Sequence, residues 1–343
     1  MIDVLTGWNV RPSVVVGHST GEIAAAYSCG AITAKEAISI SYYRGVVVKK
    51  AERGSMMAVN RGDTCQKLQD VLRHTGTSVA CYNSPQNVTV SGPVDAIQDA
   101  SRMLTDQGIA TKTLPVARSY HTRMMIKPAA EYYEILKGII RPKPTDIPMY
   151  SAVSGQRAHW NELDAQYWHD NLSEPVRFTQ AVQNILQSEQ QSDVFVEVGS
   201  HRLFSQATKD AQKFVDSQAQ IRPYLSTMIR DSDTSYHMMK LAGDLTLNGV
   251  PLDLHEVNWR ATKYARNNQH TPTWIQHLPS YAWDYSVKTW CEQQRNIEWR
   301  LRKAPRHELL GTRIPGGNSL VPMWENSISQ GQLPWLIDHK VCS

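Results

Sequence analysis

The segment VVVGHSTGEIAAAYSCGAI, which begins at Val14, constrains the fold more than any other part of the chain. Three consecutive valines are β-branched and apolar, so they predict a short buried strand. The residues from 22 to 27 predict a helix. Ser19 therefore lies on the bend between a strand and a helix, which is the position of a nucleophile elbow.

The glycines around this serine match that interpretation. Gly17 and Gly21 stand two residues before and after Ser19, and we expect the missing Cβ at both positions to let strand and helix approach closely. The amide of Thr20 would lie at the helix N-terminus, where it could stabilise an oxyanion. A plain strand-turn-helix joint is the alternative, because G-x-S-x-G also occurs by chance.

Length and composition are ordinary for a globular protein with two or three domains. The 343 residues are 41% hydrophobic and 20% charged, which excludes a disordered chain, and the net charge of +4 is scattered, so nothing indicates nucleic acid or an acidic membrane. No signal peptide or membrane-spanning run is recognisable. The cysteines are widely spaced with no CxxC pair, which favours a reducing cytoplasmic compartment and no zinc or other metal: Cys29, Cys65, Cys81, Cys291 and Cys342.

A second helix is predicted to begin at Thr33, whose hydroxyl can form a capping box with Glu36. Arg44 lies within its expected apolar face, among Ala37, Ile38, Ile40, Tyr42, Val46 and Val47. The guanidinium could extend to solvent or pair with a local carboxylate. Alternatively, it could bind the carboxylate of a substrate through its fork of donors.

The rest of the pattern predicts four regions. Residues 1–53 and 118–220 alternate strands with helices, which favours a hydrolase-like domain with a mostly parallel sheet around the elbow. Residues 54–117 read strand-helix-strand-helix-strand, the size of an inserted ferredoxin-like α+β subdomain. Residues 221–304 are irregular, as in a linker. Residues 305–343 have the short strands and glycine turns of a β-rich domain that stops before completion.

A base for the serine is the next requirement. His121 follows the last strand of the inserted subdomain, on the loop that returns to the main sheet, and such loops line clefts between subdomains. A surface or core histidine is the alternative. No acidic residue is placed as a third member, so the sequence leaves a dyad and a triad open.

Several motifs in order now identify a family. GHSTGE, Arg44 one helix later, GSMMAV, CYNSPQNVTVSG, SYHTRMM, YWHDNLSEPVRFTQAV and FVEVGSH resemble the acyltransferase domain of type I polyketide and fatty acid synthases. LPSYAWDYSVKTW and RHELLG look like the linker that follows this domain. PWLIDHKV looks like the start of the hot-dog dehydratase domain of highly reducing, fungal-type polyketide synthases.

The resemblance implies a reaction. Ser19 would attack the thioester of malonyl coenzyme A, His121 would accept its proton, and the acyl group would pass to the phosphopantetheine thiol of an acyl carrier protein. Arg44 would hold the free malonyl carboxylate through two hydrogen bonds. The acyltransferase itself would bind no cofactor. Its partners would be the carrier protein and the other synthase domains, in a parent synthase that is a homodimer.

The same resemblance suggests substrate-binding residues. His18, Thr20, Tyr120 and Asn83 match cleft positions of the family. The ring of Tyr120 would fill the space that an α-methyl group needs, which predicts a preference for malonyl, although Arg118 and Ser119 depart from the motif of malonyl-selective members. His201 follows Gly-Ser where the family has Gly-Pro, and we assign it a structural role.

The end of the chain carries a second family signature. His339 matches the histidine that opens the HxxxGxxxxP motif of dehydratases, which abstracts a proton in those domains. Ser343 takes the glycine position, and the partner aspartate of the dehydratase is absent. We therefore expect no dehydration by these residues, and in this chain we interpret His339 as an ordinary exposed histidine.

The beginning of the chain also differs from the family pattern. Eighteen residues precede Ser19, where the family has a ketosynthase, further strands and a glutamine that supplies the second oxyanion donor. We therefore expect a fragment of a larger synthase. Three hypotheses remain open: an acyltransferase, a serine hydrolase or thioesterase with the same elbow, and a non-catalytic fragment.

Overall fold

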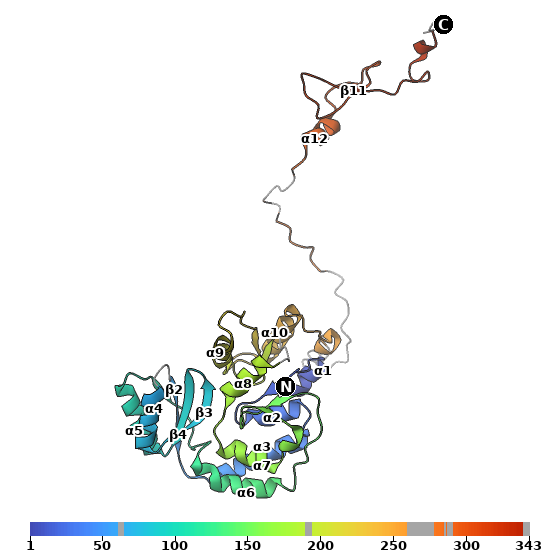
Figure 1. Cartoon of the computed structure of the whole chain (residues 1–343). Helices are drawn as coiled ribbons and strands as arrows, with labels where there is room; N and C mark the ends of the chain where they lie inside the picture. Colours follow the sequence, from blue (N-terminus) through green and yellow to red (C-terminus); the bar gives the residue numbers. More distant parts are fainter. Residues whose placement is uncertain (61–64, 189–193, 259–277, 285, 287–290, 339–343) are drawn as a thin grey trace. The chain divides into compact units, whose positions relative to one another are not determined.

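The computed structural model describes the chain apart from residues 61–64, 189–193, 259–277, 285, 287–290 and 339–343. Two compact units, residues 1–273 and 274–343, are described separately. Figure 1 follows the chain from the N-terminal helix α1 (Ile2–Gly7) through the first unit. His339 and the end of the predicted dehydratase start lie outside the described residues.

The elbow lies on a small mixed sheet. Strand β1 (Val15–Val16) pairs in parallel with β6 (Met149–Tyr150), and β6 pairs antiparallel with β7 (Arg157–Ala158). A second parallel pair joins β8 (Phe195–Glu197) to β9 (Tyr224–Ser226). The expected α/β class is confirmed, but among the described strands the parallel sheet is limited to these two short pairs.

Helices pack around the elbow strand. Helix α2 (Gly21–Ser28) follows the elbow, and α3 (Ala34–Lys49), α6 (Ile126–Leu136) and α7 (Ala165–Ser173) share its apolar core. A short 3-10 turn, η1 (Arg123–Met125), precedes α6, and another, η2 (Trp160–Glu162), precedes α7. The largest side chains of this core have almost no exposed surface, so it is a closely packed interior.

Helix α3 begins as its sequence predicts. The Glu36 amide donates to Thr33 Oγ1 over 3.2 Å, and the Thr33 amide donates to Glu36 Oε2 over 2.7 Å, which completes the capping box. The predicted apolar face was too wide, however, since Ile38 and Tyr42 are 70% and 65% exposed. Each residue of a helix is rotated by about 100° from the one before, so residues two apart face nearly opposite sides. Ile38 and Tyr42 are therefore on the solvent side, opposite the buried Ile40 and Arg44.

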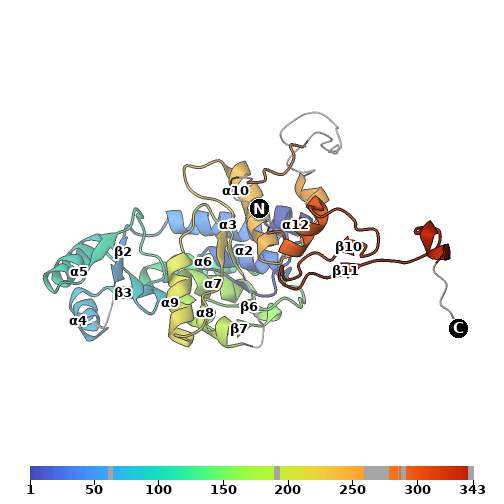
Figure 2. The same cartoon turned by 90° about the horizontal axis from the view of Figure 1, so that it is seen from above.

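The inserted subdomain has one strand more than the sequence indicated. Its order is β2 (Ser55–Asn60), α4 (Cys65–Thr75), β3 (Ser78–Ser84), β4 (Asn87–Gly92), α5 (Val94–Asp106) and β5 (Thr111–Thr113). The strands form an antiparallel sheet in the order β3-β4-β2-β5. This βαββαβ arrangement is ferredoxin-like. Figures 1 and 2 show α4 and α5 together, on one side of this sheet.

The sequence predicted an irregular segment from residue 221, and here the structure differs. Strand β9 continues the sheet from β8, and helix α10 (Thr234–Leu247) packs with α1. Helices α8 (Phe178–Gln187) and α9 (Ser205–Val215) also belong to the first unit. The segments of α1 and α10 share one apolar cluster, whose few members are widely spaced in a mostly polar sequence and so gave no clear helical pattern. Its buried residues include Leu5, Trp8, Met238, Leu241 and Leu245.

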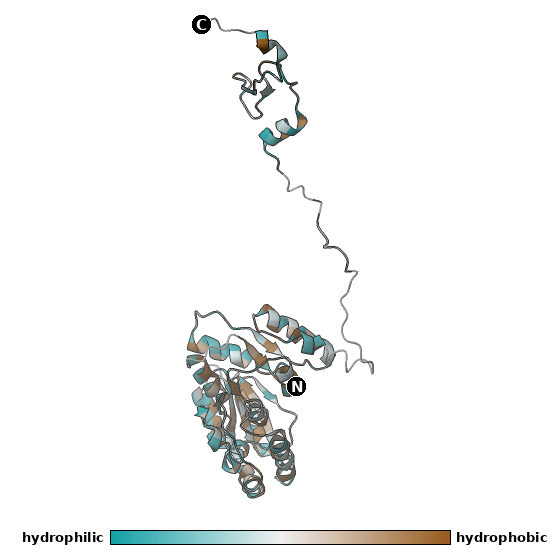
Figure 3. Cartoon of the chain, turned by 90° about the vertical axis from the view of Figure 1, so that its right-hand side faces the viewer, coloured by the Kyte–Doolittle hydropathy of each residue, from teal (hydrophilic) through white to brown (hydrophobic). Residues whose placement is uncertain are grey.

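The described residues of the second unit contain few regular elements. They are helix α12 (Gln294–Leu301), the antiparallel pair of β10 (Thr312–Arg313) and β11 (Trp324–Glu325), and the 3-10 turn η3 (Pro334–Asp338). In Figure 3 the apolar residues of the first unit gather on its strands and inward helix faces, whereas those of this unit lie on thin, open segments. Leu320 and Val321, for example, are 86% and 67% exposed.

Candidate active site

The elbow strains the backbone at Ser19. Its φ of +54° is in the left-handed region, which a residue with a Cβ seldom adopts. A Cβ at Gly17 would lie 2.2 Å from the amide nitrogen of Glu22, so that glycine is required. A Cβ at Gly21 would meet nothing within 4 Å, which corrects the expectation for this second glycine. Of the two glycines, Gly17 is therefore the one at which a side chain would clash with the helix.

The expected base contacts the expected nucleophile. Ser19 Oγ lies 2.7 Å from His121 Nε2, although 102 positions separate the two residues. His121 itself has a φ of +60°, and its Nδ1 lies 3.0 Å from the backbone carbonyl of Glu174. An Nδ1–H that donates to this carbonyl leaves Nε2 free to accept the serine proton. A main-chain oxygen therefore occupies the place that a triad gives to a carboxylate.

Burial keeps this histidine neutral. His121 is 2% exposed, and desolvation, followed by the nearby Arg44 and His18, lowers its pKa from 6.5 to about 3. The imidazole is therefore uncharged at neutral pH and can act as a proton acceptor.

Arg44 faces the same cavity and does not extend to solvent. It is 4% exposed, and its Nη1 donates to Asn171 Oδ1 over 2.6 Å. Its Nε and Nη2 are buried and make no hydrogen bond of ordinary geometry in the described part of the chain. Burial lowers the pKa of Arg44, and the neighbouring Tyr132, Tyr120 and Glu22 side chains oppose that shift. The cavity has a volume of about 660 Å³, and its lining residues are Ser19, Thr20, Ser41, Arg44, Gly45, Val48, Lys49, Ala117, Arg118 and Tyr120.

A buried carboxyl group behind the elbow was missed by the sequence reasoning. Glu22 has no exposed surface and accepts hydrogen bonds from the Ala152 amide, the Tyr167 hydroxyl and Asn171 Nδ2 over 2.7, 2.8 and 2.8 Å. Burial raises its pKa from 4.5 to about 7, although these hydrogen bonds and Arg44 oppose the shift. In sequence, an acidic residue in a first helical turn looks like an ordinary exposed partner of the helix dipole.

Two expected substrate-binding residues instead contact each other. His18 Nε2 lies 2.8 Å from Asn83 Oδ1, and the His18 ring stacks on Phe204 with a centroid distance of 4.6 Å. Asn83 belongs to β3 of the inserted subdomain, so this contact joins the elbow to that subdomain. Neither residue lines the cavity of Ser19.

The remaining sequence candidates divide between the cavity and the surface. Thr20 is the N-cap of α2, and Tyr120 lines the cavity with its ring centroid 6.4 Å from that of His121. His201 Nδ1 accepts from the Arg230 amide over 3.2 Å, and His201 is not among the residues lining the cavity. His201 therefore contacts a second loop and not the cavity of Ser19.

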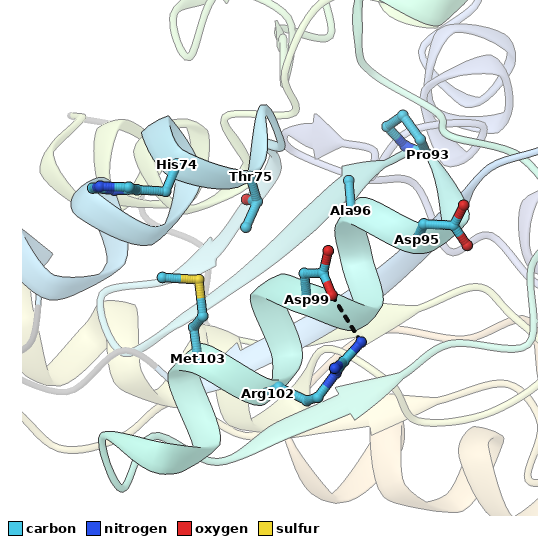
Figure 4. Close-up of a pocket in the computed structure, with 8 residues that line it drawn as sticks. All are labelled: His74, Thr75, Pro93, Asp95, Ala96, Asp99, Arg102 and Met103. Carbon is cyan, nitrogen blue, oxygen red and sulfur yellow. Dashed lines mark hydrogen bonds and ion pairs between the residues drawn. The ribbon is translucent and has the colours of Figure 1, made fainter.

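A second cavity lies on the inserted subdomain (Figure 4). It has a volume of about 620 Å³. Its lining residues come from the end of α4, from Pro93 and from α5. Its one ion pair, between Arg102 Nη2 and Asp99 Oδ1 at 2.8 Å, has both side chains more than half exposed. No unpaired buried donor lies among its lining residues.

No helix among the described residues is both long enough and apolar enough to cross a bilayer. No group of three or more His, Cys, Asp or Glu side chains in that part of the chain is arranged to hold a metal ion.

An elbow serine hydrogen-bonded to a buried neutral histidine, on an α/β scaffold, defines the class of domains that pass acyl groups through a seryl ester. Residues 1–250 match the model of the acyl transferase domain family. This chain belongs to that family.

Known proteins resemble this chain over most of its length. Highly reducing polyketide synthase GPY1 of Gibberella fujikuroi is 44% identical over 342 residues, which are 99% of this chain and 13% of the synthase. The acyltransferase domain from module 8 of the salinomycin polyketide synthase is 26% identical with a TM-score of 0.67, covering 74% of this chain and 60% of that one. The loading acyltransferase of the avermectin synthase is 28% identical with a TM-score of 0.64, covering 71% and 77%.

Proposed function

We propose that this chain is the acyltransferase region of a highly reducing polyketide synthase, and that it transfers malonyl groups from coenzyme A to an acyl carrier protein. The single observation that carries the proposal is the pair of unpaired, buried donors of Arg44 in the cavity of Ser19. Burying a cation whose donors are unpaired costs free energy, and a bound anion that accepts from those donors offsets this cost. A free acyl carboxylate is such an anion, and the fork of a guanidinium matches it.

In the first half-reaction, Ser19 Oγ attacks the thioester carbonyl while His121 Nε2 takes the hydroxyl proton. The Thr20 amide, at the N-cap of α2, donates to the developing oxyanion. The C–S bond then breaks, and His121 returns the proton to the departing thiolate of coenzyme A. The product is a malonyl ester of Ser19.

The second half-reaction reverses the roles. The phosphopantetheine thiol of the carrier protein gives its proton to His121 and attacks the Ser19 ester. The ester C–O bond breaks, and the proton returns to Ser19 Oγ. The Glu174 carbonyl holds the His121 ring throughout, which supports a dyad oriented by the main chain.

The ring of Tyr120 restricts the cavity beside His121 and favours malonyl over α-methylated acyl groups. The alignment with GPY1 covers 99% of this chain, which supports a linker and the start of a hot-dog dehydratase, with His339, after the acyltransferase. Because the family match runs to residue 250, we now begin this linker there and not at residue 221.

The partners follow from the same relatives. We propose that the carrier protein and the other domains of a homodimeric synthase are partners, because this chain spans 13% of the synthase GPY1. Cys29, Cys81 and Cys291 are free thiols, which supports a reducing cytoplasmic location.

The test is the intact mass of the chain after incubation with malonyl coenzyme A or acetyl coenzyme A. We expect a malonyl adduct in the wild type and none in Ser19→Ala. Arg44→Ala should slow malonyl loading about thirtyfold or more, because a buried charged hydrogen-bond partner is lost. Its acetyl loading should change by less than about threefold, because acetyl has no carboxylate to lose.

Arg73→Ala is the matched control, since it removes an arginine whose ion pair with Asp70 on α4 is exposed. A serine hydrolase with the same elbow would instead use water as acceptor and tolerate Arg44→Ala. Equal losses of malonyl and acetyl loading in Arg44→Ala would contradict the clamp, and a folded wild type that gains no adduct would contradict the function.

A further inference from the structure

Asn171 lies at the centre of the buried polar groups beside the elbow. It belongs to α7, is 3% exposed, and contacts three elements of the site at once. Its Oδ1 accepts from Arg44 Nη1 over 2.6 Å. Its Nδ2 donates to the backbone carbonyl of Ser19 over 3.1 Å and to Glu22 Oε2 over 2.8 Å. The side-chain amide of Asn171 therefore accepts a hydrogen bond from Arg44 and donates to both Ser19 and Glu22.

The contact with Arg44 determines which edge of the guanidinium is available. Nη1 is occupied by Asn171, whereas Nε and Nη2, which share the other edge, have no partner in the described residues. Two parallel donors on one edge match the two oxygens of a carboxylate. Without Asn171, the guanidinium could turn about its side chain and offer a different edge to the cavity.

The neutral side chain of Asn171 also connects two buried ionisable groups. Glu22 and Arg44 are 0% and 4% exposed, and Asn171 hydrogen-bonds to both of them. A carboxylate in its place would pair directly with the fork of Arg44 and cancel the charge that an incoming acyl carboxylate needs. An amide accepts from the cation without neutralising it.

We propose that Asn171 is a positioning residue that gives the site its selectivity for acyl groups bearing a free carboxylate, by holding one edge of Arg44 and leaving its charge uncancelled. This inference rests on the proposed function. Asn171 does not line the cavity, so it acts through Arg44 and not by contact with the acyl group.

The test compares malonyl with acetyl loading of Ser19 in Asn171→Asp. This substitution keeps the size of the side chain and the acceptor for Arg44, but adds a negative charge and removes the donors. We expect the malonyl-to-acetyl ratio of loading rates to fall at least about tenfold, because the new carboxylate competes with the acyl carboxylate for Arg44. A displaced Ser19 would slow both acyl groups alike, so the ratio isolates the effect on Arg44.

Asn184→Asp is the matched control, because Asn184 Nδ2 donates to the Gly155 carbonyl over 2.6 Å in another part of the first unit. Its ratio should stay within about twofold of the wild type. If Asn171→Asp does not fold, Asn171→Ser removes the same hold on Arg44 with no added charge. The half-saturating malonyl coenzyme A concentration should then rise about tenfold, with that for acetyl coenzyme A unchanged.

The outcomes separate the two proposals. A wild type that loads acetyl and malonyl equally would overturn the proposed function and its clamp. A wild type that prefers malonyl, with the preference unchanged in a folded Asn171 variant, would overturn this inference alone.

Discussion

Two cavities of similar size differ in what their walls contain. The cavity of Ser19 and the cavity of Figure 4 have volumes of about 660 and 620 Å³. The first contains a guanidinium that is 4% exposed and has two unpaired donors. The second contains Arg102, whose charge is paired with Asp99 in water. Volume therefore does not distinguish the cavity that we propose as the active site, whereas the burial of its polar groups does.

The physical reason is the cost of desolvation. A surface ion pair contributes about 0–1 kcal/mol because water competes for both charges. A buried charge has lost its water and needs protein or ligand partners in exchange. Around Ser19 the packing of α2, α3 and α7 enforces that loss, and three predictions test how far the two regions differ.

The largest expected effect concerns the buried Glu22. Its pKa is 4.5 in the unfolded chain and about 7 in the folded one, so the folded state binds more protons between these values. Stability should therefore fall as pH rises from 4.5 to 7, by about 3 kcal/mol from this group. Glu22→Gln should lack that dependence, which urea unfolding at several pH values would measure.

Glu134→Gln is the control for this prediction, because Glu134 is exposed on α6. The quantity to compare is the difference in unfolding free energy between each variant and the wild type, which removes contributions from other groups. A difference for Glu22→Gln that stays constant between pH 4.5 and 7 would show that this carboxyl group is not buried as described.

The second prediction compares alanine substitutions at the two elbow glycines, for which we expect a smaller change in unfolding free energy. Gly17→Ala should destabilise the fold by about 1–3 kcal/mol and slow acyl loading, because its Cβ would overlap the backbone at the start of α2. Gly21→Ala should be neutral or stabilising by up to about 1 kcal/mol, since its Cβ meets open space in a helix. Equal losses in both variants, measured by urea unfolding, would contradict the one-sided approach of strand and helix.

The smallest effect is expected in the cavity of Figure 4. Arg102→Ala and Asp99→Ala should each change the unfolding free energy by no more than about 0.5 kcal/mol, because their ion pair is exposed. Malonyl loading should stay at the wild-type rate. A loss of loading in either variant would mean that this second cavity also takes part in the reaction, and the comparison would fail.

Local chemistry explains what could be predicted from the sequence. The strand-turn-helix around Ser19 and the capping box of Thr33 depend on neighbouring residues, and both are present in the structure. Strand β3 was missed because bulges between Val79 and Cys81 and between Tyr82 and Ser84 interrupt its alternation. The two-residue period that signals a strand is therefore lost.

The elbow, the α/β class and the family could be predicted from the amino-acid sequence, because each depends on a few adjacent side chains or on motifs in a set order. The burial of Arg44 with one edge free, the carbonyl that orients His121, and the places of Asn171 and Glu22 behind the elbow are visible only in the folded chain. Glu22 and Asn171 are 149 positions apart in the chain. Burial and pairing are properties of the packed neighbours of a group, and only folding brings those neighbours together.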